Sequence, residues 1–136
     1  MNYELYGISA AKLRALHTFA LSRDGGSEGE RDPDGIDGVV GATITSALYF
    51  RSSDSPDILA FVAFLTIKIA MGHYFIDGNK RLAWTSLIVA LGSRYYSLDA
   101  SEDEAIQIIG KICDHAIDAE NLIDWISERV TEVAQF

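Results

Sequence analysis

The sequence HYFIDGNKR, residues 73–81, lies between two strongly apolar segments and decides how the chain folds. The segment before it, 58–71, predicts a core helix, because a membrane span needs about 20 apolar residues and Lys68 interrupts this shorter run. The segment after it predicts a second helix that begins at Asn79 and ends near Gly92. The quoted stretch is therefore a short polar loop that joins two helices.

Further helices are predicted on both sides of this pair. Ser9 can cap a helix that ends before Gly25 and Gly26. The residues SEDE, 101–104, have the spacing of a capping box and introduce another helix. The predicted last helix carries the apolar residues Leu122, Trp125, Ile126, Val130 and Val133.

The remaining segments are less regular. Residues 23–38 are rich in Gly, Asp and Glu and predict a long, exposed and mobile loop, and residues 51–57 predict a polar turn. Residues 39–50 fit either a β-hairpin flap or a short helix. We expect a single domain, residues 1–136, that is an all-α bundle with a long N-terminal loop. The sequence does not decide whether the domain also has a small β flap.

Charge and cysteine content exclude several classes of protein. The net charge of −9 argues against a broad basic face that coats nucleic acid. A single cysteine excludes an internal disulfide, and the N-terminus lacks the basic start and apolar block of a secretory signal. We expect a cytoplasmic protein that binds no membrane and no nucleic acid directly.

The loop has the chemistry of an anion site. A helix that begins at Asn79 leaves the N–H groups of its first turn without partners in the helix, and they point at whatever precedes it. Gly78 permits a tight turn and the close approach of a ligand. Lys80 and Arg81 place two cations where the helix dipole disfavours them, unless a phosphate-rich ligand neutralises them.

Two neighbouring residues extend this hypothesis. Asp77 can hold Mg²⁺, which prefers oxygen ligands and bridges carboxylates to substrate phosphates, and His73 can act as a general base. The structural alternative is that Asp77 or Asn79 only caps the helix and that His73 only ends the previous one. That alternative leaves the adjacent Lys80 and Arg81 unexplained, so we favour the catalytic interpretation.

These nine residues resemble the active-site motif of the Fic/Doc family, H-x-F-x-[DE]-[GA]-N-[GK]-R. The resemblance extends to Leu16 and His17 with the glycines that follow, and to DHAIDAENLIDWI at 114–126, which are similar to segments of death-on-curing (Doc) proteins. It implies a Fic-type helical bundle. His73 would deprotonate a hydroxyl of a target protein, and Asp77 would hold Mg²⁺. The resemblance implies that four residues bind the phosphates of ATP: Gly78, Asn79, Lys80 and Arg81.

Two positions place the chain nearer to Doc than to Fic enzymes that transfer AMP. The AMP-transferring pattern has glycine at the position of Lys80 and a second arginine at the position of Trp84. The resemblance to Doc implies a toxin that moves the γ-phosphate of ATP to Ser or Thr of a translation factor, with elongation factor Tu as the expected target, and so arrests translation. Lys80 and Arg81 would neutralise charge during this transfer. An adenylyltransferase and a catalytically silent domain that binds an antitoxin remain the alternatives.

The resemblance also implies a partner. Many Fic proteins restrain themselves with a helix that carries [ST]-x-x-x-E-[GN], and this pattern is absent from residues 1–136. We therefore expect a separate, Phd-like antitoxin with a segment that folds as an amphipathic helix into an apolar groove near the loop. The net charge of −9 favours an antitoxin segment that is basic, or at least not strongly acidic.

Other candidate residues have simpler interpretations. His17 lies at a helical position that faces the core and is expected to be a hydrogen-bonded core histidine. His115 is a weaker candidate for catalysis. Arg31, in the long loop, is expected to be a solvated arginine rather than a ligand for nucleotide or target.

Overall fold

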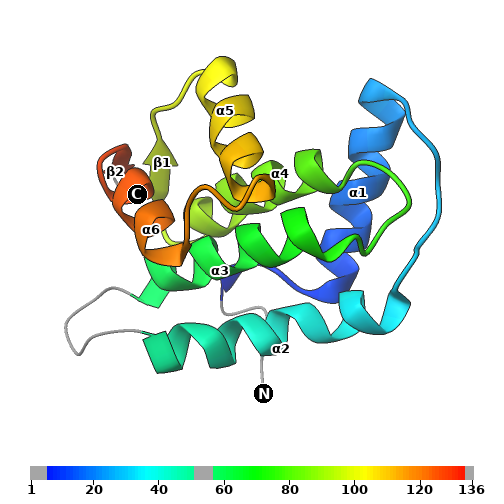
Figure 1. Ribbon diagram of the computed structural model, residues 1–136, viewed down its shortest axis with the longest axis horizontal. Coiled ribbons are helices and arrows are strands. Elements are labelled where there is room, and N and C mark those ends of the chain that lie inside the picture. Colours follow the sequence, from blue (N-terminus) through cyan, green and yellow to red (C-terminus); the bar gives the residue numbers. More distant parts are fainter. Residues whose placement is uncertain (1–5, 51–56, 134–136) are drawn as a thin grey trace.

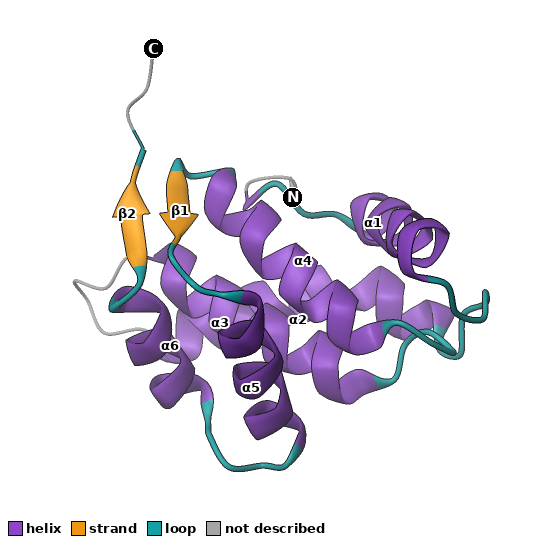
Figure 2. Cartoon of the chain, turned by 90° about the horizontal axis from the view of Figure 1, so that it is seen from above, coloured by secondary structure: helices purple, strands orange, loops and turns teal. Residues whose placement is uncertain are grey.

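The computed structural model describes residues 6–50 and 57–133, and this part of the chain is mostly helical (Figures 1 and 2). The helices are α1 (Ala10–Asp24), α2 (Pro33–Phe50), α3 (Asp57–Gly72), α4 (Asn79–Gly92), α5 (Glu102–Cys113) and α6 (Ala119–Ser127). Two short strands, β1 (Tyr96–Leu98) and β2 (Val130–Glu132), complete the fold. The all-α prediction is confirmed. None of the helices in the described ranges is long and apolar enough to cross a membrane.

Helix α3 forms the centre of the core. Its apolar sequence has no polar face, which is typical of a helix that is covered on all sides. Phe61, Leu65 and Ile69 are fully buried, and the helix packs against α2, α4, α5 and α6. In Figure 1, α3 crosses the middle of the molecule, with α1 at one end and the two strands at the other. The loop after α3 therefore lies at the α1 end.

The predicted caps and helix ends are confirmed at three helices. The Ser9 hydroxyl accepts the N–H of Lys12 at 3.0 Å and begins α1, which ends at Gly25 with a φ of 81°. The capping box of α5 is complete, since Ser101 and Glu104 each accept the other's backbone N–H. Helix α4 has the predicted limits.

The prediction for residues 23–38 is wrong in part, because α2 begins at Pro33. Proline suits the first turn of a helix, where its missing N–H costs nothing. Residues 39–50 are helical and form no β-hairpin flap. The buried residues of α2 follow helical spacing and face the core: Ile36, Val39, Val40, Thr43 and Ala47. The turn expected at 51–57 lies outside the described residues, except for its last position, which is helical.

The last helix is shorter than predicted. Helix α6 ends at Ser127, and Val130 belongs to β2, with Val133 just beyond it. Strand β2 pairs antiparallel with β1, with Leu98 opposite Val130. β-branched residues favour this extended conformation. The small sheet lies at the end of the molecule opposite α1 (Figure 2).

Candidate functional site

His73 begins the loop between α3 and α4. Its φ of 52° lies in the left-handed region, which turns the chain sharply out of α3 just after Gly72. Within the described residues its imidazole makes no hydrogen bond or ion pair, and the residue is exposed. His73 thus ends a helix, as the structural alternative expects, while its side chain stays available for proton transfer.

Asn79 fixes the shape of the loop. Its side-chain oxygen accepts the N–H of Phe75 at 3.0 Å, and its side-chain nitrogen donates to the carbonyl of Phe75 at 2.8 Å. Phe75 is buried, and its ring stacks on His17 with 3.7 Å between ring centroids. The Asn79 amide is therefore engaged with the loop backbone, and what this residue offers a ligand is its own backbone N–H.

His17 supports the same loop from α1. It is 4% exposed, and its Nε2 lies 2.7 Å from the carbonyl oxygen of Asp77. Because a carbonyl only accepts, Nε2 carries the proton in this contact. The interpretation of His17 as a hydrogen-bonded core histidine is confirmed. The sequence analysis did not foresee that it holds the backbone of Asp77.

The Asp77 carboxylate is oriented by two backbone donors. Oδ1 accepts the N–H of Gly78 at 2.9 Å, and Oδ2 accepts the N–H of Ser27 at 3.1 Å. A side chain at Gly26 would come within 2.9 Å of Oδ2, so only glycine fits beside this carboxylate. The side chain remains exposed, and each oxygen keeps a lone pair for another ligand.

This arrangement fits Mg²⁺ that arrives with a phosphate ligand. In the described part of the chain, no group of three or more His, Cys, Asp or Glu residues could hold a metal ion. Mg²⁺ commonly uses one or two carboxylates together with water and phosphate oxygens. Asp77 can supply one such carboxylate, but not a closed protein cage.

The N-terminus of α4 has no side-chain cap. Gly78 occupies the cap position with a φ of 81°, and no side-chain oxygen accepts the first N–H groups of the helix. Lys80 and Arg81 are exposed in the first turn, and Lys80 makes no ion pair with any described residue. Free N–H groups, a positive dipole end and two cations form an anion-binding arrangement.

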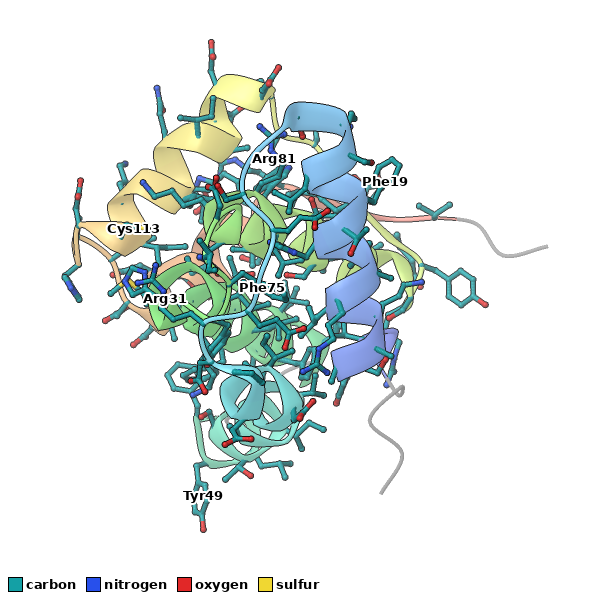
Figure 3. All side chains as sticks on the ribbon, turned by 90° about the vertical axis from the view of Figure 1, so that its right-hand side faces the viewer. Phe19, Arg31, Tyr49, Phe75, Arg81 and Cys113 are labelled. Atoms are coloured by element: carbon teal, nitrogen blue, oxygen red, sulfur yellow. The ribbon has the colours of Figure 1, made fainter. Side chains whose placement is uncertain are left out.

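Arg81 is held by the end of α1. Its Nε lies 3.1 Å from Oδ2 of Asp24, the last residue of that helix. The other carboxylate oxygen of Asp24 lies 3.5 Å from Nε of Arg23. Figure 3 shows Arg81 beside the C-terminal turn of α1. Three cations thus gather at one end of the loop, with a single carboxylate between two of them.

Comparison with known proteins identifies the family to which the chain belongs. A model of the Fic/DOC family matches residues 7–91, more than half of the chain. The chain belongs to the Fic/DOC family. It is also similar to the protein kinase doc of Escherichia phage P1, with 33% identity over 84 residues. This match covers 62% of the chain and 64% of the phage protein, so the chain spans less than two thirds of that relative's length.

The segment 25–32, between α1 and α2, lies along the motif loop 73–81 of this Fic/DOC chain. The carbonyl of Tyr74 accepts the N–H groups of Arg31 and Asp32, at 2.8 and 3.0 Å, and the carbonyl of Gly29 accepts the N–H of Ile76 at 3.1 Å. This segment belongs to residues 23–38, for which the sequence predicts an exposed and mobile loop. It is exposed, but it is hydrogen-bonded to the loop that carries His73.

Arg14 of α1 anchors this segment. Its guanidinium donates to Glu30 at 2.8 Å and to Asp37 at 2.7 Å. The hydrogen bond from Arg14 holds the pKa of Glu30 below its ordinary value. Tyr74 packs nearby, and burial followed by the charge of Asp32 raises its pKa. One cation therefore connects α1, the segment 25–32 and the start of α2.

The side chains of the remaining candidates take no part in these contacts. The side chain of Arg31 is exposed and makes no ion pair with the described residues, which agrees with a solvated arginine. His115 is exposed just after α5. Trp84 is half-buried and packs edge-on against Trp125, with 6.3 Å between ring centroids. The position of a second motif arginine is thus occupied by a packing residue.

A groove runs from the cations along α4 and α5. Its volume is about 720 Å³, and Arg23, Lys80 and Arg81 line one end. Its apolar lining includes Ile88 and Ile106, which are 39% and 65% exposed. The structure therefore joins the anion site to an apolar surface that the rest of the described chain leaves uncovered.

Proposed function

We propose that this protein is a Doc-like toxin that transfers the γ-phosphate of ATP to a Ser or Thr hydroxyl of a target protein. The uncapped N-terminus of α4, with Lys80 and Arg81 in its first turn, is the observation that carries this proposal. Such a helix end is unfavourable without an anion and favourable with a polyphosphate. The phage relative is named as a protein kinase, which supports phosphoryl transfer.

The residues of the loop have different roles in phosphate transfer. The backbone N–H groups of Asn79 and Lys80 bind phosphate oxygens and Gly78 permits their close approach, while Lys80 and Arg81 offset the charge that develops on the transferred group. Asn79 contributes by holding the loop through both backbone groups of Phe75. Catalysis of phosphoryl transfer depends mainly on positioning and charge, which this hydrogen-bonded loop provides.

Proton transfer falls to His73. Its imidazole takes the proton of the Ser or Thr hydroxyl as that oxygen bonds to the γ-phosphorus, while the bond from the γ-phosphorus to the oxygen retained by ADP breaks. Asp77 would hold Mg²⁺. The ion, when bound, supplies charge neutralisation to the phosphates. His17 and the N–H groups of Gly78 and Ser27 keep Asp77 in place for this role.

Two positions favour phosphate transfer over AMP transfer. Lys80 adds bulk and charge at the anion site, where the AMP-transferring pattern has glycine. Trp84 packs on Trp125 and supplies no second arginine. We infer a different seating of the nucleotide, with the γ-phosphorus presented to the acceptor hydroxyl. Adenylyl transfer is the second candidate, because the rest of the motif is common to both reactions.

We propose elongation factor Tu as the target and the cytoplasm as the compartment, both from the resemblance to Doc. The test incubates the protein and a bacterial lysate with ATP labelled separately at the γ and α positions. Label from the γ position on one translation factor is expected. Label from the α position supports adenylyl transfer, and no label from either position supports a catalytically silent domain. In a parallel assay, Lys80→Gly is expected to weaken transfer of the γ label.

We also propose that a Phd-like antitoxin restrains the enzyme. An amphipathic helix of the antitoxin would bind in the groove between α4 and α5, and its apolar face would cover Ile88 and Ile106. The groove ends at Arg23, Lys80 and Arg81, so a helix seated there reaches the anion site. The net charge of −9 favours an antitoxin segment that is basic, or at least not strongly acidic.

A pair of substitutions tests the groove. Ile106→Asp places a charge on its wall and is expected to abolish co-purification with the product of the neighbouring reading frame. Leu48→Asp is the matched control, because Leu48 is equally exposed, at 62%, but lies on α2 outside the groove. If both variants lose co-purification with the partner equally, the proposal that the antitoxin binds in this groove is contradicted. Failure of any neighbouring product to bind contradicts the toxin–antitoxin pair, while leaving the enzyme proposal in place.

A further inference from the structure

Asp24 and Arg81 carry charges at the unfavourable ends of their helices. Asp24 is the last residue of α1, where the dipole repels an anion, and Arg81 lies in the first turn of α4, where it repels a cation. The two side chains face each other at 3.1 Å. Each misplaced charge is therefore compensated by the other, and the contact joins two helices that meet at the proposed phosphate site.

The geometry of the contact leaves Arg81 able to bind an anion. The closest approach of Asp24 is to Nε, and the two terminal nitrogens of the guanidinium donate no hydrogen bond to any described residue. Those nitrogens form the edge that binds a phosphate with two hydrogen bonds. The second oxygen of Asp24 faces Arg23, which lines the same end of the groove as Lys80. Asp24 therefore faces two arginines whose terminal nitrogens make no hydrogen bond with the described residues.

We propose that Asp24 is a positioning residue that holds Arg81 in the orientation that receives the nucleotide phosphates. This inference rests on the proposed function of the loop and adds a residue outside its nine-residue motif. Arg81 is 46% exposed, so without a partner its long side chain samples many rotamers and loses that freedom on binding. An arginine already held at Nε loses less.

The sign of the effect distinguishes this role from simple competition. If Asp24 mainly competed with phosphate for Arg81, its removal would tighten nucleotide binding. If it positions Arg81, its removal weakens binding, and the weakening depends on Arg81 being present. A variant with an intact contact and a longer carboxylate side chain, Asp24→Glu, is expected to retain most of the affinity.

The experiment is a double-mutant cycle on binding of ATP with Mg²⁺, measured by calorimetry without target protein. Asp24→Asn is compared in the wild-type and Arg81→Gln backgrounds. Asp114→Asn is the matched control, because Asp114 caps the C-terminus of α5 and makes no ion pair with the described residues. Both substitutions relieve the repulsion between a carboxylate and a helix C-terminus. Only Asp24→Asn releases Arg81.

We expect Asp24→Asn to weaken ATP binding roughly threefold to fivefold, the range of a partly exposed ion pair. No further weakening is expected in the Arg81→Gln background, and none in Asp114→Asn. Tighter binding, or an equal loss with and without Arg81, overturns the inference. If wild-type protein binds ATP but transfers no phosphate, the proposed function fails while the cycle still decides the role of Asp24. If the wild type binds no ATP, both fail.

Discussion

Helices α4 and α5 begin in opposite ways. At α5, Ser101 and Glu104 cap each other's backbone at 3.1 and 3.2 Å, and three carboxylates occupy the first turn. At α4, Gly78 supplies no capping side chain, and the first turn carries cations instead. The start of α5 is what helix stability alone favours. The start of α4 departs from it in each respect.

The difference has an energetic meaning. A missing side-chain cap costs about 1 kcal/mol, and the cation of Lys80, which pairs with no described residue, costs about 0.3–1 kcal/mol, whereas Asp24 already compensates Arg81. A bound polyphosphate removes these costs, because its oxygens accept the free N–H groups and neutralise Lys80 and Arg81. The start of α4 is therefore what the proposed phosphate site requires, and the predictions below test the contrast between the two helix starts.

The largest effect is expected from His73→Ala. We expect the rate of phosphate transfer to fall roughly 10²- to 10⁴-fold, as for loss of a general base, while ATP still binds at the start of α4. Because His73 is exposed, thermal unfolding should change little. Transfer of the γ label and calorimetric binding of ATP are measured on the same protein. A folded variant that transfers phosphate at the wild-type rate contradicts the assignment.

Asn79→Ala is expected to destabilise the fold by about 2 kcal/mol, because both backbone groups of buried Phe75 lose their partner. Transfer should fall with it, since the loop loses its fixed shape. Asn121→Ala is the control: this exposed asparagine, the third residue of α6, accepts the N–H of Asp118 just before its helix. Denaturant unfolding should show a smaller loss there, with activity unchanged. Equal losses would mean that the two bonds from Asn79 to Phe75 contribute no more than an ordinary helix cap.

Lys80→Glu converts the first turn of α4 toward that of α5. We expect ATP affinity to fall about tenfold, as for loss of a charge-assisted phosphate contact, and stability to rise by about 0.5 kcal/mol. Lys111→Glu, in the last turn of α5, is the opposite control and should lower stability without changing ATP binding. If Lys80→Glu is less stable than wild type, the cation was not opposed by the helix.

The sequence predicted the elements that carry their own signals. Ser9 and Ser101 marked helix starts, and the loop with His73 stood out because its charges contradict helix stability. Residues 33–50 gave no such signal, because three glycines and several β-branched residues weaken helix propensity. Burial of Val39 and Val40 in the core overrides that propensity, and burial follows from tertiary packing.

The supports of the site were equally invisible in the sequence. The contact of His17 with Asp77 joins residues 60 positions apart, and that of Asp24 with Arg81 spans a comparable distance. Nothing local marks such pairs, since each residue also suits an ordinary surface or core position. The motif therefore predicts which groups do the chemistry, whereas the residues that hold them emerge only from the fold.

The smallest effect concerns pH at the start of α5. The N–H of Ser101, followed by Arg129, holds the pKa of Glu104 below its ordinary value. A carboxyl with a lowered folded pKa stabilises the fold above its unfolded pKa, and that stability is lost as pH falls through the folded pKa. We therefore expect Glu104→Gln to lower the melting temperature slightly at pH 7 and to match wild type in strong acid, in thermal scans from pH 7 to pH 2. Transfer of the γ label should not change, since this helix start serves stability alone. A constant gap between the two proteins across the pH range would mean that the charge of Glu104 contributes nothing to the cap.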